Sequence, residues 1–165
     1  MMLPQRKPNR LTEFDYSAPG AYFITICTQE KKCILSHIVG GGALDAPRPC
    51  LTKVGLIAEK YILSGNRIPG ITVDKYVIMP NHIHMILLID ENSFSKSLNT
   101  LSPANAAIPH FVSTFKRFCH RDIGSAIFQR SYHDPVIRNE EDYRQLWNYI
   151  DANPSKWQED RFCPE

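Results

Sequence analysis

Two β-forming segments that lie only two residues apart constrain the fold of this chain more than any other feature. Residues 71–79 and 82–89 are rich in Ile, Val, Leu and other residues that suit strands. Pro80 and Asn81, which separate the segments, are typical turn residues. We therefore expect the two segments to form an antiparallel β-hairpin.

Elements on both sides of this hairpin alternate between strand and helix. Residues 22–28 are β-branched and aromatic and predict a strand, and residues 127–132 predict another. Two helices are predicted from apolar residues that recur every three or four positions, and Thr52 is suited to cap the first. The apolar faces consist of Val54, Ile57, Ala58, Tyr61 and Ile62 in the first helix, and of Ile108, Phe111, Val112, Phe115, Phe118 and Cys119 in the second.

A third helix is expected near the C-terminal end of the chain. Asn139 can cap it, and the three acidic residues that follow suit the positive end of its dipole. The resulting order is β-α-β-β-α-β followed by a helix. This order matches the split, ferredoxin-like α+β arrangement, in which an antiparallel sheet carries two helices on one face.

The composition is that of an ordinary globular domain, with 165 residues, 43% hydrophobic and 22% charged. We expect one domain over residues 1–165, with flexible loops at 39–50 and 90–105. No apolar run approaches the roughly 18–20 residues that span a bilayer, and the polar start of the sequence lacks a signal-peptide pattern. The five cysteines are scattered and include no Cys-x-x-Cys pair. These features predict a cytoplasmic protein with reduced thiols and no membrane association.

The charges are unevenly distributed, although the net charge is only +2. Residues 1–10 carry three cations and no acid, residues 110–138 carry five cations against two acids, and residues 139–165 carry seven acids against three cations. Clustered cations can neutralise phosphates, but they can equally form a solvated surface. The candidates for contacts with phosphates are Arg6, Lys7, Arg10, Lys116, Arg117 and Arg130.

A His-x-His pair opens the second strand of the predicted hairpin. Side chains alternate across a strand, so His82 and His84 should project to the same face, roughly 6–7 Å apart along the chain. Ile83 between them should point into the core. Two imidazoles on one face can share a divalent metal, but each could instead be a hydrogen-bonded surface residue.

Tyr149 and Asn153 lie on one edge of the predicted last helix. The apolar stripe of that helix consists of Tyr143, Leu146, Trp147 and Ile150. At 100° per residue, Tyr149 falls about 110° from the centre of this stripe, and Asn153 follows one turn later on nearly the same flank. A tyrosine hydroxyl and an amide oxygen could therefore face a metal together. The alternative is that Tyr149 is a half-buried packing residue.

Two segments in combination resemble one protein family. Residues 79–84 read Met-Pro-Asn-His-Ile-His and precede an apolar strand, and residues 149–157 read Tyr-Ile-Asp-Ala-Asn-Pro-Ser-Lys-Trp. Supporting segments occur in order along nearly the whole chain, at 6–10, 22–28, 113–118, 129–134 and 137–141. With these segments the sequence resembles the single-tyrosine HUH transposases, and among them the REP-associated tyrosine transposase branch of the IS200-like superfamily.

This resemblance implies a ferredoxin-like, metal-dependent endonuclease and strand transferase that acts on single-stranded DNA at hairpins or repeats during transposition. His82 and His84 match the HUH pair, and Asn153 matches the amide-bearing third metal ligand. Tyr149 matches the nucleophile that forms a 5′-phosphotyrosine intermediate. The implied cofactor is Mg²⁺ or Mn²⁺, and the imidazoles favour Mn²⁺. The implied partner is single-stranded or hairpin DNA, bound by a cytoplasmic, nucleoid-associated monomer or homodimer.

Two other functions stay open at this point. A domesticated relative could bind hairpin DNA without productive cleavage. A ferredoxin-like RNA-binding module would carry exposed aromatic rings on its central strands, where this sequence has His82 and His84 instead. The choice of nucleophile also has an alternative, because Tyr132 ends the predicted fourth strand beside His133.

Overall fold

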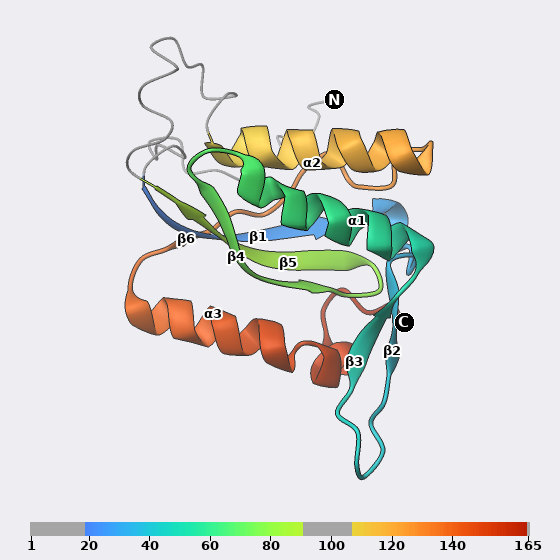
Figure 1. Cartoon of the computed structure of the whole chain (residues 1–165). Coiled ribbons are helices and arrows are strands. Elements are labelled where there is room, and N and C mark those ends of the chain that lie inside the picture. The colour runs from blue at the N-terminus through green and yellow to red at the C-terminus, as the bar shows by residue number, and fades with distance from the viewer. Residues whose placement is uncertain (1–18, 91–106, 165) are drawn as a thin grey trace, which may run out of the picture.

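The computed structural model describes residues 19–90 and 107–164, which form an α+β fold with antiparallel sheets (Figure 1). The strands are β1 (Gly20–Cys27), β2 (Ser36–Val39), β3 (Arg48–Leu51), β4 (Ile71–Ile78), β5 (His82–Ile89) and β6 (Val136–Ile137). The helices are α1 (Lys53–Ser64), α2 (Ala107–Ile123) and α3 (Glu140–Ala152), with short 3-10 helices η1 (Gln29–Lys31), η2 (Gly65–Arg67) and η4 (Pro154–Glu159). The predicted phosphate contacts Arg6, Lys7 and Arg10, and nearly all of the predicted loop 90–105, lie outside the described residues.

Four strands form the main sheet in the order β4-β5-β1-β6. The predicted hairpin is confirmed, because β4 and β5 pair antiparallel with Ile78 opposite Ile83. β5 also pairs antiparallel with β1, which places Cys27 opposite His82. The start of β5 is therefore held between two strands, and this determines which face each of its alternating side chains occupies.

Helices cover both faces of this sheet (Figure 1). α1 and α2 pack on one face, where the larger hydrophobic core includes Ile24 and Ile83. α3 packs on the other face, where a smaller core includes Ile86 and Ile150. The face under α3 is the one that receives the side chains alternating with Ile83, and it is the face that concerns the candidate site.

The predicted caps of two helices are confirmed. The Thr52 hydroxyl accepts a hydrogen bond from the Gly55 amide at 3.1 Å, and the Asn139 side chain accepts one from the Asp142 amide at 2.8 Å. Gly55 also permits close packing, because a Cβ atom there would lie 2.0 Å from the carbonyl oxygen of Leu35. No helix within residues 19–90 and 107–164 is long and apolar enough to cross a membrane.

The prediction of a continuous fourth strand at 127–132 is wrong. Only two isolated bridges join this region to the edge of the sheet, Thr28 with Phe128 and Thr25 with His133. The outer segment has two more residues between these bridges than the inner one. The two additional residues interrupt the pairing with β1 as a bulge does, and regular pairing resumes only in the short strand β6.

Residues 39–50, predicted as a flexible loop, instead include the end of one strand and most of another in a two-stranded hairpin, β2–β3. The base of this hairpin is fixed by the Ser36 hydroxyl, which donates to the Ile78 carbonyl at 2.9 Å. Gly40 and Gly41 have φ angles of 88° and 102°, so the glycines of this segment mark a turn. The strand Arg48–Leu51 that follows pairs with β2 alone in the two-stranded sheet.

Candidate active site

The side chains of His82 and His84 lie together on the face of β5 that is covered by α3. Their exposed fractions are 0% and 1%, and their ring centroids are 4.5 Å apart. Ile83, on the opposite face, belongs to the larger core. The strand alternation therefore places two buried imidazoles side by side, as the sequence pattern indicates.

Hydrogen bonds at Nδ1 orient both imidazoles. His82 Nδ1 lies 2.9 Å from the side-chain oxygen of Asn81. The amide group of Asn81 donates to the carbonyls of Lys31 and Phe162, so its oxygen is the acceptor for the proton on His82 Nδ1. His82 Nε2 is then left with its lone pair, which is the state of a metal ligand. His84 Nδ1 lies 2.8 Å from the Thr25 hydroxyl.

Asp160 joins the two histidines from the segment after η4. His82, His84 and Asp160 each contribute one possible ligand atom, and these three atoms all lie within 4.8 Å of one another. His82 Nε2 lies 3.9 Å from Asp160 Oδ2, and the carboxylate side chain is only 3% exposed. Two imidazoles and a carboxylate are a donor set that divalent metals accept. This group could therefore hold a metal ion.

Sequence reasoning missed Asp160. The residue stands seven positions after Asn153 in an acid-rich segment, and no spacing rule singles it out. Its position depends on the turn that follows η4, where Asp160 Oδ1 accepts from the Phe162 amide at 2.8 Å. The Phe162 ring then packs over the histidines, with its centroid 4.5 Å from that of His82.

Asn153 ends α3 and lies against the same group of donors. Its side chain is 2% exposed, and its Nδ2 donates to Asp160 Oδ2 at 3.0 Å. Its Oδ1 and the Nε2 of His82 are buried without a hydrogen-bond partner among the described residues. Buried polar atoms normally have partners, since leaving one unsatisfied costs about 1–3 kcal/mol. A bound cation would satisfy both atoms, so these residues fit a metal.

Tyr149 reaches the histidines from α3. Its hydroxyl lies 3.4 Å from His84 Nε2, and its ring meets the His84 ring edge-on, with the two ring centroids 5.3 Å apart. The residue as a whole remains 39% exposed. The alternative Tyr132 lies elsewhere, on the segment at the outer edge of β1, with the Lys116 ammonium 5.5 Å from its ring centroid. Tyr149 therefore combines solvent access with a hydroxyl at the candidate metal group.

Burial keeps both imidazoles neutral. It lowers the pKa of His82 to about 4, and burial together with the neighbouring His82 lowers the pKa of His84 well below its usual range. Burial and the charge of Asp160 raise the pKa of Tyr149, while Arg161 and Asn153 partly oppose that increase. At neutral pH the site therefore offers unprotonated nitrogen ligands beside a protonated phenol.

The predicted DNA contacts within the described residues do not gather at this site. Lys116 belongs to α2, on the opposite face of the sheet, and its ammonium donates to the carbonyls of Gln129, Arg130 and Ser131 at 2.7, 3.3 and 3.5 Å. Burial lowers the pKa of Lys116 to about 8. Its ammonium thus holds the bulged edge segment. Arg117 and Arg130 are exposed.

The sequence and the structure were also compared with those of known proteins. No known family model matches the chain. An uncharacterized protein of Haemophilus influenzae (strain Rd) is 28% identical over an alignment of 175 positions, which covers 94% of this chain and 92% of that protein. A solved REP-associated tyrosine transposase, bound to a REP hairpin, matches 94% of this chain and 74% of its own, with a TM-score of 0.61 and 20% identity. Over most of its length the chain is therefore structurally similar to a REP-associated tyrosine transposase.

Proposed function

We propose that this protein is a metal-dependent single-stranded DNA endonuclease and strand transferase, in which Tyr149 is the nucleophile. The observation that carries the proposal is the Tyr149 hydroxyl, 3.4 Å from His84 Nε2, beside the His82–His84–Asp160 group. A tyrosine that served only in packing would have no need to place its hydroxyl at a cluster of buried ligand atoms while remaining 39% exposed. The strand order β4-β5-β1-β6 supports the ferredoxin-like topology expected for this class.

His82, His84 and Asp160 would hold a Mg²⁺ or Mn²⁺ ion, with the Asn153 carbonyl oxygen as a further ligand. The ion, when bound, would stabilise the negative charge that develops on a scissile phosphate. Asn153 also positions Asp160 through the hydrogen bond from Nδ2. Mn²⁺ suits a site with two imidazoles better than a site made of oxygen alone.

The reaction that this arrangement suits is a reversible transfer of a phosphoryl group. The Tyr149 oxygen would form a bond to phosphorus, and the bond from phosphorus to the 3′ oxygen would break. The departing 3′ oxygen takes up a proton, while the phenol loses its own to solvent. A 5′-phosphotyrosine results, and because it conserves the phosphodiester, another 3′-hydroxyl can reverse the step and join new ends. A single chain supplies every residue named, so a monomer would be sufficient.

The test is covalent trapping on a folded single-stranded oligonucleotide with Mn²⁺. We expect a protein–DNA adduct with the wild type and with Tyr132→Phe, and none with Tyr149→Phe, because that change removes only the reacting hydroxyl. Circular dichroism should show that both variants are folded. An adduct mapped to Tyr132, or a full yield from Tyr149→Phe, would refute the assignment. Hairpin binding without any nick or adduct would instead favour a binding protein that does not cleave.

A further inference from the structure

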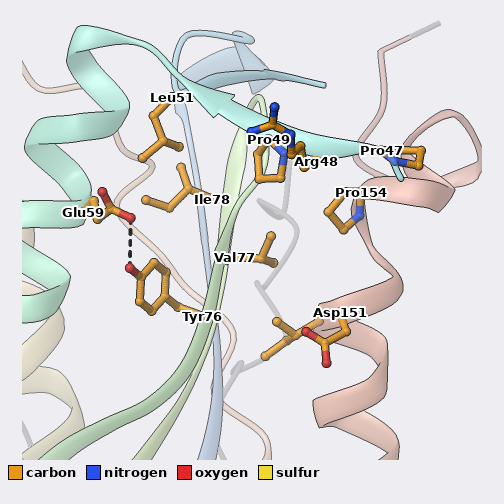
Figure 2. Close-up of a pocket in the computed structure, with 11 residues that line it drawn as sticks. Pro47, Arg48, Pro49, Leu51, Glu59, Tyr76, Val77, Ile78, Asp151 and Pro154 are labelled. Carbon is orange, nitrogen blue, oxygen red and sulfur yellow. Dashed lines mark hydrogen bonds between the residues drawn. The ribbon is translucent and has the colours of Figure 1, made fainter. Parts of the chain in front are cut away.

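The β2–β3 hairpin forms two hollows with the C-terminal elements. One, of about 340 Å³, lies between β3, β4 and the end of α3 (Figure 2). Three of its polar side chains already have partners, since the Tyr76 hydroxyl donates to Glu59 at 2.9 Å and Asp151 pairs with Lys75 at 2.6 Å. The other hollow is an open groove of about 630 Å³ between the hairpin and η4.

This groove adjoins the candidate active site. Trp157 lines it, and the Trp157 ring centroid lies 6.0 Å from that of His82. Pro154, which directly follows Asn153, and Pro80, which precedes Asn81, line it as well. The wall of the groove and the wall of the metal group are thus built from the same two short segments.

The groove suits an unpaired base better than a phosphate. Trp157 offers a partly exposed indole, and stacking on such a ring accepts any base. His37 and Lys156 are exposed at the groove and can donate hydrogen bonds, while Glu159 supplies a carboxylate that offsets the charge of Lys156. Because the charge is nearly balanced, we expect stacking to provide most of the affinity there.

We propose that this groove binds the unpaired nucleotides next to the scissile phosphate, with one base stacked on Trp157. The nature of the ligand rests on the proposed function, whereas the groove and its contact with His82 do not. A second copy of this chain is the other occupant that the test must detect.

The chain has two tryptophans, which makes the test direct. The other tryptophan, Trp147, lies on α3, where the Lys75 ammonium is 4.4 Å from its ring centroid. Trp147→Phe leaves Trp157 as the only tryptophan, which can be excited selectively over the seven tyrosines, and Trp157→Phe is the matched reverse variant. On titration with a short unstructured DNA oligonucleotide, emission should be quenched in Trp147→Phe and change little in Trp157→Phe. Trp157→Ala should weaken binding about tenfold, the effect of losing one stacked base.

Anisotropy of a labelled oligonucleotide measures binding independently of tryptophan emission, and adduct formation reports separately on the proposed function. Quenching of Trp157 without an adduct would support the groove and contradict the strand transferase. Adduct formation with unchanged Trp157 emission would overturn the groove alone, as would equal affinity in Trp157→Ala and Trp147→Phe. No oligonucleotide binding at all would also overturn it. Trp157 emission that changes with protein concentration in the absence of DNA would assign the groove to a second copy.

Discussion

At the scale of single residues, the Asn81 side chain determines which nitrogen of His82 is available. Its amide group donates to the carbonyls of Lys31 and Phe162, so only its oxygen can face His82 Nδ1. The lone pair of His82 is thereby directed at Asp160. A residue that appears in the sequence only as part of a turn thus orients a candidate metal ligand.

Asp160→Asn should weaken Mn²⁺ binding by more than about tenfold, because it removes a negative charge from the ligand group while preserving the size of the side chain. Glu159→Gln is the matched control, since that neighbouring acid is exposed and outside the group. The double variant His82→Ala/His84→Ala should lose binding altogether. Calorimetric titration measures all three, and an unchanged affinity in Asp160→Asn would exclude the carboxylate as a ligand.

At the scale of elements, α3 is attached to β4 by side chains that flank Tyr149. The Lys75 ammonium pairs with Asp151 at 2.6 Å and lies over the Trp147 ring, and the Tyr143 hydroxyl donates to Asp74. These contacts hold the helix that carries the tyrosine, whereas the histidines belong to β5. The nucleophile and the two histidine ligands therefore lie on different elements, whereas Asn153 and Asp160 follow α3 in the chain.

Lys75→Met should loosen the attachment of α3 to β4 and so affect Tyr149 more than the histidines on β5. We expect it to lower the free energy of unfolding by about 1 kcal/mol, the size of a partly exposed ion pair with a cation–π contact. The rate of adduct formation should fall by a larger factor than the Mn²⁺ affinity, because His82 and His84 stay on β5. Lys53→Met, on the exposed start of α1, serves as the control. Equal losses of metal affinity and adduct rate would contradict the separation.

A second pair of elements, α1 and α2, is joined by a carboxylate with several donors. Asp122 accepts hydrogen bonds from Tyr61, Lys60 and Arg121, which together lower its pKa to about 2. A carboxyl with a lowered pKa in the folded state contributes stability above its unfolded pKa, near 4, and loses that contribution as the pH falls toward 2.

The melting temperature should therefore fall between pH 4 and pH 2 in the wild type, and this part of the decrease should be absent in Asp122→Asn. Asp90→Asn, at an exposed carboxylate after β5, should retain the wild-type profile. Thermal unfolding followed by circular dichroism at half-unit steps of pH measures the difference. Parallel curves for the wild type and Asp122→Asn would contradict the assignment.

At the scale of the whole molecule, the two faces of the main sheet have different roles. The face under α1 and α2 buries the larger hydrophobic core, and the face under α3 holds the candidate site (Figure 1). Lys116, which the sequence suggested as a DNA contact, lies with the first face and holds the bulged segment. The exposed Arg130 belongs to that same segment.

Salt dependence should distinguish phosphate contacts from structural cations. If about four cations neutralise phosphates, log affinity for single-stranded DNA should fall with log salt at a slope near −3, from roughly −0.7 per contact. Arg130→Gln should reduce that slope by about 0.7. Lys116→Met should keep the slope but lower the melting temperature, because three carbonyls lose their donor. A slope near zero would refute an electrostatic footprint.

Several features of the candidate site follow from the local periodicity of the sequence. Alternation along a strand placed His82 and His84 on one face, and Thr52 and Asn139 marked the starts of α1 and α3. The helical period likewise put Tyr149 on a flank of its helix, where the residue is partly exposed. Each of these inferences involves residues only a few positions apart, so the backbone geometry of one element is sufficient to predict them.

The tertiary structure alone decided the features that join distant segments. Asp160 reaches the histidines because the chain reverses after η4 and Phe162 packs against their rings. Lys116 faces the carbonyls at 129–131 because the edge segment carries two residues more than β1 can pair. No local pattern encodes such contacts, since they depend on how whole elements pack and on which buried polar atoms then need partners.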